Sequence, residues 1–210
     1  MSFDPVPPPY NHLDPTARFL SSSALDFLLI EVVPMSYRIN SEISEGEGEE
    51  EEEREAAFYR LEGIGYRVGQ GLVERFAKDR GKFGDALDVI KFVCKDLWGL
   101  VFRKQVDNLK TNHRGNFIWE GHADNLFWWK QGVYVLTDNN FRPLSRMSVE
   151  TGGRSGGAQQ AAVVRAQPFL WVPCGIVRGA LAAMGIQATV QAETTELPGA
   201  VFQIKTLPAK

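Results

Sequence analysis

Two stretches of the sequence place glycines four residues apart inside patterns that are otherwise typical of apolar helices. In LEGIGYRVGQGLVERF, residues 61–76, Gly65 lies on an apolar stripe with helical spacing, and Gly69 follows four residues later on the same side of the helix. In PCGIVRGALAAMG, residues 173–185, Gly175 and Gly179 have the same separation. Because glycine in a helix costs about 0.5–1 kcal/mol relative to alanine, repeated glycines need a packing reason. We predict that all four lie at close helix contacts, with this chain's own helix or with a partner's.

The first glycine stretch does not match a phosphate-binding loop. A dinucleotide-binding loop needs Gly-x-Gly-x-x-Gly after a strand, but here the sixth position is Val68 and the preceding segment is acidic and helical. A P-loop needs Gly-Lys-Ser/Thr, whereas Gly69 is followed by Gln70. Nucleotide binding is therefore not expected.

The charge of the chain is concentrated in one short segment. Nine glutamates and one arginine in residues 41–55 carry a charge of −8, so the rest of the chain carries about +5 of the total of −3. A run of like charges with so few apolar side chains predicts a solvated linker. The small positive remainder, without clusters of Arg and Lys among aromatics, argues against nucleic-acid binding.

Apolar periodicity divides the remaining sequence into helices and strands. Helical spacing predicts four main helices, over residues 14–37, 58–76, 85–109 and 168–184. Pro34 is expected to kink or cap the last turn of the first helix. Alternating patterns predict a hairpin with its turn at Asp138–Asn140, and a second hairpin formed by residues 186–193 and 200–207.

These elements predict an α/β (α+β) domain with four helices on one face of a twisted four-stranded antiparallel sheet. Hydrophobic residues make up 44% of the 210 residues, which is enough for a sizeable core. Residues 1–15 are expected to be a flexible tail before a single domain over residues 16–210. The segments expected to interrupt this domain are the acidic linker 41–55, a Trp-rich insertion 118–131 and a Gly/Ser-rich loop 148–160.

No group of residues points to catalysis, a metal or a cofactor. Cys94 and Cys174 lie inside apolar segments, as buried free thiols usually do, and neither has a base nearby in the sequence. No pair of cysteines or histidines has the spacing of metal ligands. Arg178 lies inside an apolar helix, where it forms either an internal hydrogen-bonded strut or an interface contact. The chain has no secretory signal or membrane-spanning run, so we expect it to be soluble and intracellular.

Several of these motifs resemble the small core subunits of the TRAPP vesicle-tethering complex, most of all its sixth subunit type. The resemblance is carried by LEGIGYRVGQGLVERF, ALDVIKFVCKDLW, DNLKTNHRG and, above all, CGIVRGAL. It implies a non-catalytic scaffold subunit whose partners are other TRAPP core subunits, with a heterodimer formed with the acylated small core subunit and further subunits at the opposite end. The family's assembled core is a nucleotide exchange factor for a Rab GTPase in ER–Golgi and Golgi traffic. Contact with the GTPase would be indirect, and the chain would be cytoplasmic and peripheral at ER, cis-Golgi and Golgi membranes through the complex.

The same resemblance implies that the interface with a partner is apolar and is formed by the first two helices. The residues expected there are Phe19, Leu20, Phe27 and Ile30 from the first helix and Phe58, Leu61 and Tyr66 from the second. A second hypothesis is a ligand-sensing module with an apolar pocket for a lipid or acyl chain.

Three features depart from the family pattern. Acylated relatives carry a cysteine between the second and third helices, but residues 78–87 contain none, which excludes acylation at that site. The insertion 118–131 holds Trp119, Phe127, Trp128 and Trp129, as a locally packed group or a docking patch. Pro173 precedes the Cys174 motif and is expected to kink that helix or delay its start.

Overall fold

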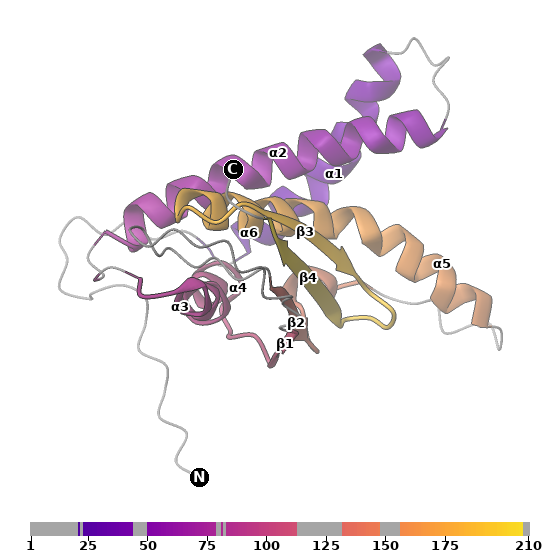
Figure 1. Cartoon of the computed structure of the whole chain (residues 1–210). Coiled ribbons are helices and arrows are strands. Elements are labelled where there is room, and N and C mark those ends of the chain that lie inside the picture. Colours follow the sequence, from indigo (N-terminus) through magenta and orange to yellow (C-terminus); the bar gives the residue numbers. More distant parts are fainter. Residues whose placement is uncertain are drawn as a thin grey trace.

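The computed structural model describes residues 21, 23–43, 50–78, 81, 83–112, 132–147 and 156–207 (Figure 1). Within this part of the chain, helices pack against a four-stranded sheet. In chain order the helices are α1 (Ala24–Ile43), α2 (Glu50–Phe76), α3 (Ala86–Phe92), a π-helical turn (Val93–Leu97), α4 (Trp98–Phe102), α5 (Gly156–Ala166) and α6 (Trp171–Ala183). The strands are β1 (Asn108–Asn112), β2 (Val133–Asp138), β3 (Ala188–Glu193) and β4 (Ala200–Thr206). Two 3-10 turns cover Arg142–Leu144 and Gln167–Leu170.

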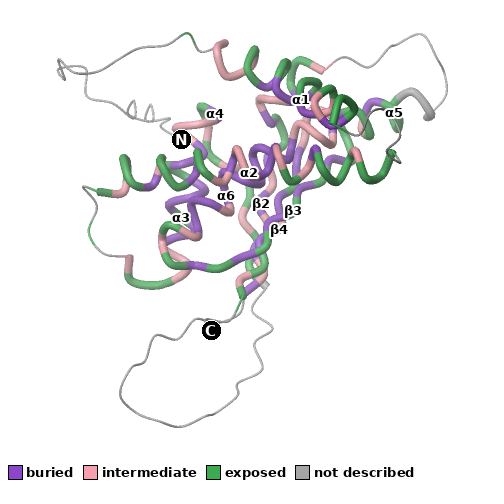
Figure 2. The backbone as a smooth tube through the Cα atoms, turned by 90° about the horizontal axis from the view of Figure 1, so that it is seen from above, coloured by how far each residue is buried: buried purple, intermediate pink, exposed green. Residues whose placement is uncertain are grey.

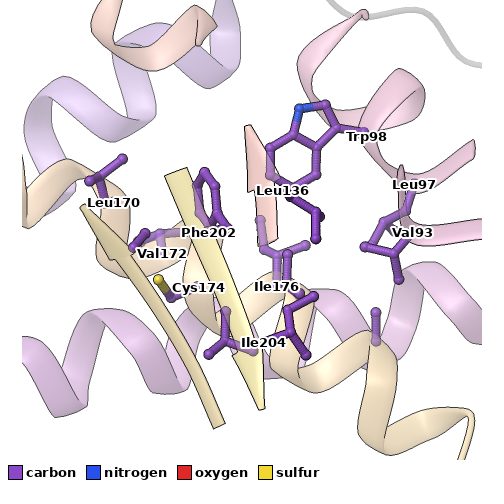
Figure 3. Close-up of a cluster of buried hydrophobic side chains, with 14 of the residues drawn as sticks. Val93, Leu97, Trp98, Leu136, Leu170, Val172, Cys174, Ile176, Phe202 and Ile204 are labelled. Carbon is purple, nitrogen blue, oxygen red and sulfur yellow. The ribbon is translucent and has the colours of Figure 1, made fainter. Parts of the chain in front are cut away.

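The sheet has the order β1-β2-β4-β3, with antiparallel neighbours throughout. Successive side chains of β3 alternate between buried and exposed, as expected when one face of a sheet is covered. Figure 3 shows the result, a cluster in which Leu136, Phe202 and Ile204 from the strands meet side chains from α4 and α6. The predicted fold class, with helices on one face of an antiparallel sheet, is confirmed.

The first helix is longer at its C-terminal end than the sequence predicted. It passes through Pro34 and ends at Ile43, not near Tyr37. Its buried stripe continues through Ser36 and Asn40, and the amide of Asn40 donates to the carbonyl of Glu53 at 3.1 Å. These contacts extend the helix beyond the proline. The predicted start of this helix, and the tail 1–15, lie outside the described residues.

The acidic segment 41–55 is only partly a linker. Residues 41–43 end α1, residues 50–55 form the first turns of α2, and residues 44–49 lie outside the described part. The linker prediction is therefore wrong at both ends. Four glutamates in the first turn of α2, Glu50 to Glu53, are favourable because the N-terminal end of a helix dipole is positive. The run of like charges therefore does not prevent helix formation at either end of this segment.

The third helix is shorter than predicted, and a strand was missed. The helix predicted over residues 85–109 corresponds to α3, the π-helical turn and α4 together, and it ends at Phe102. Arg103 then takes a left-handed conformation with φ 64°, and residues 108–112 form β1. The sequence NLKTN has no alternation of apolar residues, so only its pairing with β2 identifies it as an edge strand. The hairpin predicted around residues 138–140 is also wrong, since β2 pairs with β1 and β4 and is followed by a 3-10 turn.

The C-terminal half agrees more closely with the sequence. The strands predicted over residues 186–193 and 200–207 are confirmed as β3 and β4. Pro173 lies in the first turn of α6, where a proline is tolerated, and Gly185 ends the helix with φ +84°. The loop predicted over 148–160 is wrong at its end, because residues 156–160 belong to α5. Residues 148–155 and the insertion 118–131 lie outside the described residues.

Candidate functional site

The four predicted packing glycines lie where α2 crosses α6. A Cβ atom added at Gly65 would lie 2.1 Å from the carbonyl oxygen of Val172, and one at Gly69 would lie 2.1 Å from that of Ile176. A Cβ at Gly175 or Gly179 would lie 2.0 Å from the carbonyl oxygen of Glu62 or Tyr66. The two strips therefore face each other within one chain, and the backbones are closer than any side chain allows.

An ion pair joins the two helices beside this crossing. The guanidinium of Arg178 on α6 donates to both carboxylate oxygens of Glu62 on α2, with Nη2 2.6 Å from Oε2. The same guanidinium lies over the ring of Tyr66, 4.3 Å from its centroid. The hydrogen bond with Glu62 raises the pKa of Arg178. Of the two roles left open by the sequence, the structure shows the internal strut.

Both cysteines are buried free thiols. Burial raises the pKa of Cys94 to about 12, and burial together with the nearby charge of Glu62 raises the pKa of Cys174. Because the thiolate is the reactive form, neither thiol is suited to nucleophilic attack. Among the described residues, no three His, Cys, Asp or Glu side chains are grouped so as to hold a metal ion.

The native protein should not react with a thiol reagent. We expect both Cys94 and Cys174 to remain unlabelled by DTNB at pH 8 in buffer, and both to react in 6 M guanidinium, because exposure then restores the ordinary thiol pKa. The absorbance of the released thionitrobenzoate counts the reacted thiols. Rapid labelling of one thiol in the native state would contradict its burial.

A buried carboxylate anchors the end of β2. Asp138 is completely buried, accepting hydrogen bonds from Trp98 Nε1 at 2.9 Å, Lys104 Nζ at 2.6 Å and the backbone amide of Asn140 at 3.0 Å. Lys104 also donates to Asp107 at 2.9 Å. This network holds α4 against the strand and has a structural role.

The pKa of Asp107 makes this network sensitive to acid. The hydrogen bond from Lys104 lowers that pKa, burial opposes the effect, and the amide of Asn139 adds to it. A carboxylate with a lowered folded-state pKa stabilises the fold above its unfolded pKa of about 4 and loses this contribution as pH falls through the folded value. We therefore expect the melting temperature of the wild type to fall more between pH 6 and pH 3 than that of Asp107→Asn. Parallel pH profiles for the two proteins would contradict this role of Asp107.

The outer side of α1 carries large apolar side chains that contact nothing in the described part of the chain strongly enough to bury them. Phe27 is 68% exposed and Ile30 54% exposed, and Leu28 and Met35 are exposed as well. We call these four residues the α1 face. Figure 2 shows exposed positions along α1, while Leu29, Val32 and Val33 of the same helix are buried. When a helix is apolar on two sides, one side packs in the core of its own chain and the other is a surface that a partner can cover.

The predicted interface residues divide into four groups. Phe27 and Ile30 lie on the α1 face, whereas Phe19 and Leu20 lie outside the described residues. Leu61 is completely buried in the chain's own core, so its placement at a partner interface is wrong.

Phe58 and Tyr66 are only partly buried. The ring of Phe58 packs edge-on against that of Trp171, with 5.6 Å between the ring centroids. The ring of Tyr66 lies under the guanidinium of Arg178. Both aromatic rings therefore pack within the chain. Leu28 and Met35 are exposed on α1 but are not among the predicted interface residues. The run LDFLLIEVVPM, with apolar residues all round a helix, nevertheless indicates a second apolar side.

A depression lies beside α3 and the π-helical turn that follows it. Its volume is about 430 Å³, and its lining residues are Gly81, Phe83, Asp88, Lys91, Phe92, Lys95 and Asp96. Four of these seven residues are charged, and a lining with so many charges does not suit an acyl chain. The depression therefore gives no support to the lipid-pocket hypothesis. No helix among the described residues has the length and hydropathy needed to cross a membrane.

Comparisons with known proteins agree with the fold and the motifs. The family model "Transport protein particle (TRAPP) component" matches residues 25–207. The chain is 43% identical to trafficking protein particle complex subunit 6B of Homo sapiens, over 69% of this chain and 75% of the relative. It is 44% identical to subunit 6b of Danio rerio, over 69% of this chain and 76% of the relative.

A solved structure supports the fold. Subunit 3 of the trafficking protein particle complex from Naegleria fowleri, covalently bound to palmitic acid, superposes with a TM-score of 0.50. It is 13% identical and covers 87% of this chain and 95% of its own. At that identity the likeness concerns the fold alone. The family match over residues 25–207 and the identities to subunits 6B and 6b show that the chain belongs to the TRAPP component family, as a small core subunit of the sixth type.

Proposed function

We propose that this chain is a non-catalytic scaffold subunit of the TRAPP vesicle-tethering complex and that the α1 face binds another small core subunit. The observation that carries the proposal is the exposure of Phe27, Leu28, Ile30 and Met35 on one helix of a TRAPP family member. Large apolar side chains gathered on one exposed helix are typical of protein interfaces, and the interfaces of permanent complexes are the most apolar. The buried thiols, with their raised pKa values, support a role without catalysis.

The partner that we propose is the acylated small core subunit. The subunit 3 of Naegleria fowleri carries palmitic acid, so the subunit-3 protein of this chain's own organism is the one to test. In this account the heterodimer holds neighbouring subunits that contact a Rab GTPase, and this chain affects nucleotide exchange only through them. It acts in the cytoplasm, peripherally at ER and Golgi membranes, in ER–Golgi and Golgi traffic.

Co-expression with that subunit tests the proposal. We expect gel filtration with light scattering to show a 1:1 complex for the wild type. Ile30→Asp should weaken binding by about a hundredfold, because a charge in a covered apolar interface is left without a partner. Val164→Asp is the matched control, since Val164 on α5 is 64% exposed, against 54% for Ile30, and its replacement should leave the complex intact. Ile30→Asp binding as tightly as the wild type would place the interface elsewhere.

A further inference from the structure

Pro34 interrupts the backbone hydrogen bonding of α1 in the middle of the helix. A proline has no amide hydrogen, so the carbonyl of Ile30, four residues earlier, lacks the donor that an α-helix would supply. The pyrrolidine ring also crowds this carbonyl and pushes it away from the helix axis. A helix that keeps such a residue leaves one strong acceptor available on its surface.

This acceptor lies on the α1 face itself. Phe27, Ile30 and Pro34 are separated by three and four residues, so they share one side of the helix, and all three are exposed. While the face is open, water can bind the Ile30 carbonyl. Once a partner covers it, water is excluded, and an acceptor left without a donor weakens the complex.

Two polar side chains that follow Ile30 on α1 are already engaged. The hydroxyl of Ser36 donates to the carbonyl of Val32 at 3.0 Å on the buried side of the helix. The guanidinium of Arg38 bonds to Glu31 across two turns of the exposed side. Neither of these two side chains is therefore available to donate to the Ile30 carbonyl.

We infer that the subunit bound to the α1 face presents a hydrogen-bond donor side chain, such as Arg, Lys, Asn, Gln, Tyr or Trp, to the carbonyl of Ile30. This inference rests on the proposed function and names the chemistry of the partner at that site. The surrounding apolar contacts supply affinity, and the single donor supplies selectivity. A partner with an apolar side chain at this point buries an unsatisfied carbonyl and binds less well.

The test compares Pro34→Ala with the wild type, using the subunit-3 protein of the same organism as the probe. Alanine restores the amide, closes the hydrogen bond to Ile30 and removes the acceptor from the face. We expect the isolated variant to melt at a higher temperature than the wild type. We expect its affinity for the probe to fall by about threefold to tenfold, as for the loss of one hydrogen bond. Glu42→Ala, on an exposed position of the last turn, is the control and should bind as the wild type does.

Weaker binding of Pro34→Ala could come from the lost hydrogen bond or from a change in the shape of the helix. A structure of the wild-type complex distinguishes the two causes. We expect a nitrogen or oxygen of a partner side chain at hydrogen-bond distance, about 2.7–3.2 Å, from the Ile30 oxygen. Carbon atoms or bulk water over that oxygen, or Pro34→Ala binding within twofold of the wild type, would overturn the inference while leaving the proposed function standing. A wild type that forms no complex with the probe would overturn both.

Discussion

Replacement of Gly69 by alanine should destabilise the protein by about 3 kcal/mol or more, a large effect for a single methyl group. The added Cβ would lie 2.1 Å from the carbonyl oxygen of Ile176 and 2.8 Å from the amide nitrogen of Ala180. Both contacts are with backbone atoms, which cannot rotate away as a side chain can. Relief requires α2 and α6 to separate along their whole crossing, which opens the core beneath them.

Larger side chains at the same crossing should prevent folding. We expect Gly65→Leu and Gly179→Leu to give no cooperative thermal transition, because each added side chain starts within 2.1 Å of a facing carbonyl. Thermal unfolding followed by circular dichroism measures both variants beside Gly69→Ala. Wild-type melting of any of the three would contradict the close approach of α2 and α6.

The same helix provides matched controls. Gly63 and Gly71 belong to α2, but a Cβ atom added at either would meet nothing within 4 Å. Gly63→Ala and Gly71→Ala should therefore stabilise the isolated chain by about 0.5–1 kcal/mol each, the usual gain from replacing glycine in a helix. A loss of stability for Gly69→Ala beside a gain for Gly63→Ala and Gly71→Ala would separate the effect of packing from that of helix propensity.

Replacement of Lys104 by methionine should cost about 3 kcal/mol, since it leaves the Asp138 carboxylate buried without its cation. Asp138 would keep its hydrogen bonds to Trp98 and Asn140, but the ammonium group 2.6 Å away would be lost. Lys104 is itself partly exposed, which places the cost at the lower end of the range for buried ion pairs.

A double-mutant cycle isolates this interaction. Lys104→Met should cost much less when Asp138 is already asparagine, because no buried charge then remains to be compensated. Urea unfolding of the wild type, both single variants and the double variant gives the coupling energy. Additive effects would show that the ion pair contributes nothing beyond its separate contacts.

The sequence predicted the parts of the fold that local patterns encode. The glycine strips, the apolar faces of α2 and α6 and the final hairpin of β3 and β4 all follow from spacing within one element. The parts that it mispredicted depend on distant contacts. Strand β1 is polar and is held by pairing with β2, and α1 continues past Pro34 because Asn40 reaches the carbonyl of Glu53.

The candidate site shows the same division. The resemblance predicts an interface on the first helix, and Phe27 and Ile30 are exposed there. The prediction for Leu61 is wrong because its apolar character suits a core and an interface equally, and the structure buries it in the chain's own core. Periodicity alone cannot say which apolar side of a helix faces its own chain.

Native mass spectrometry of the full-length chain, purified under gentle conditions from its own cells, tests the central claim most directly. We expect a 1:1 heterodimer with another TRAPP small core subunit, alone or within larger assemblies, and its loss when Ile30 is replaced by aspartate. A monomer without TRAPP subunits, or a monomer that carries a bound lipid, would contradict the account.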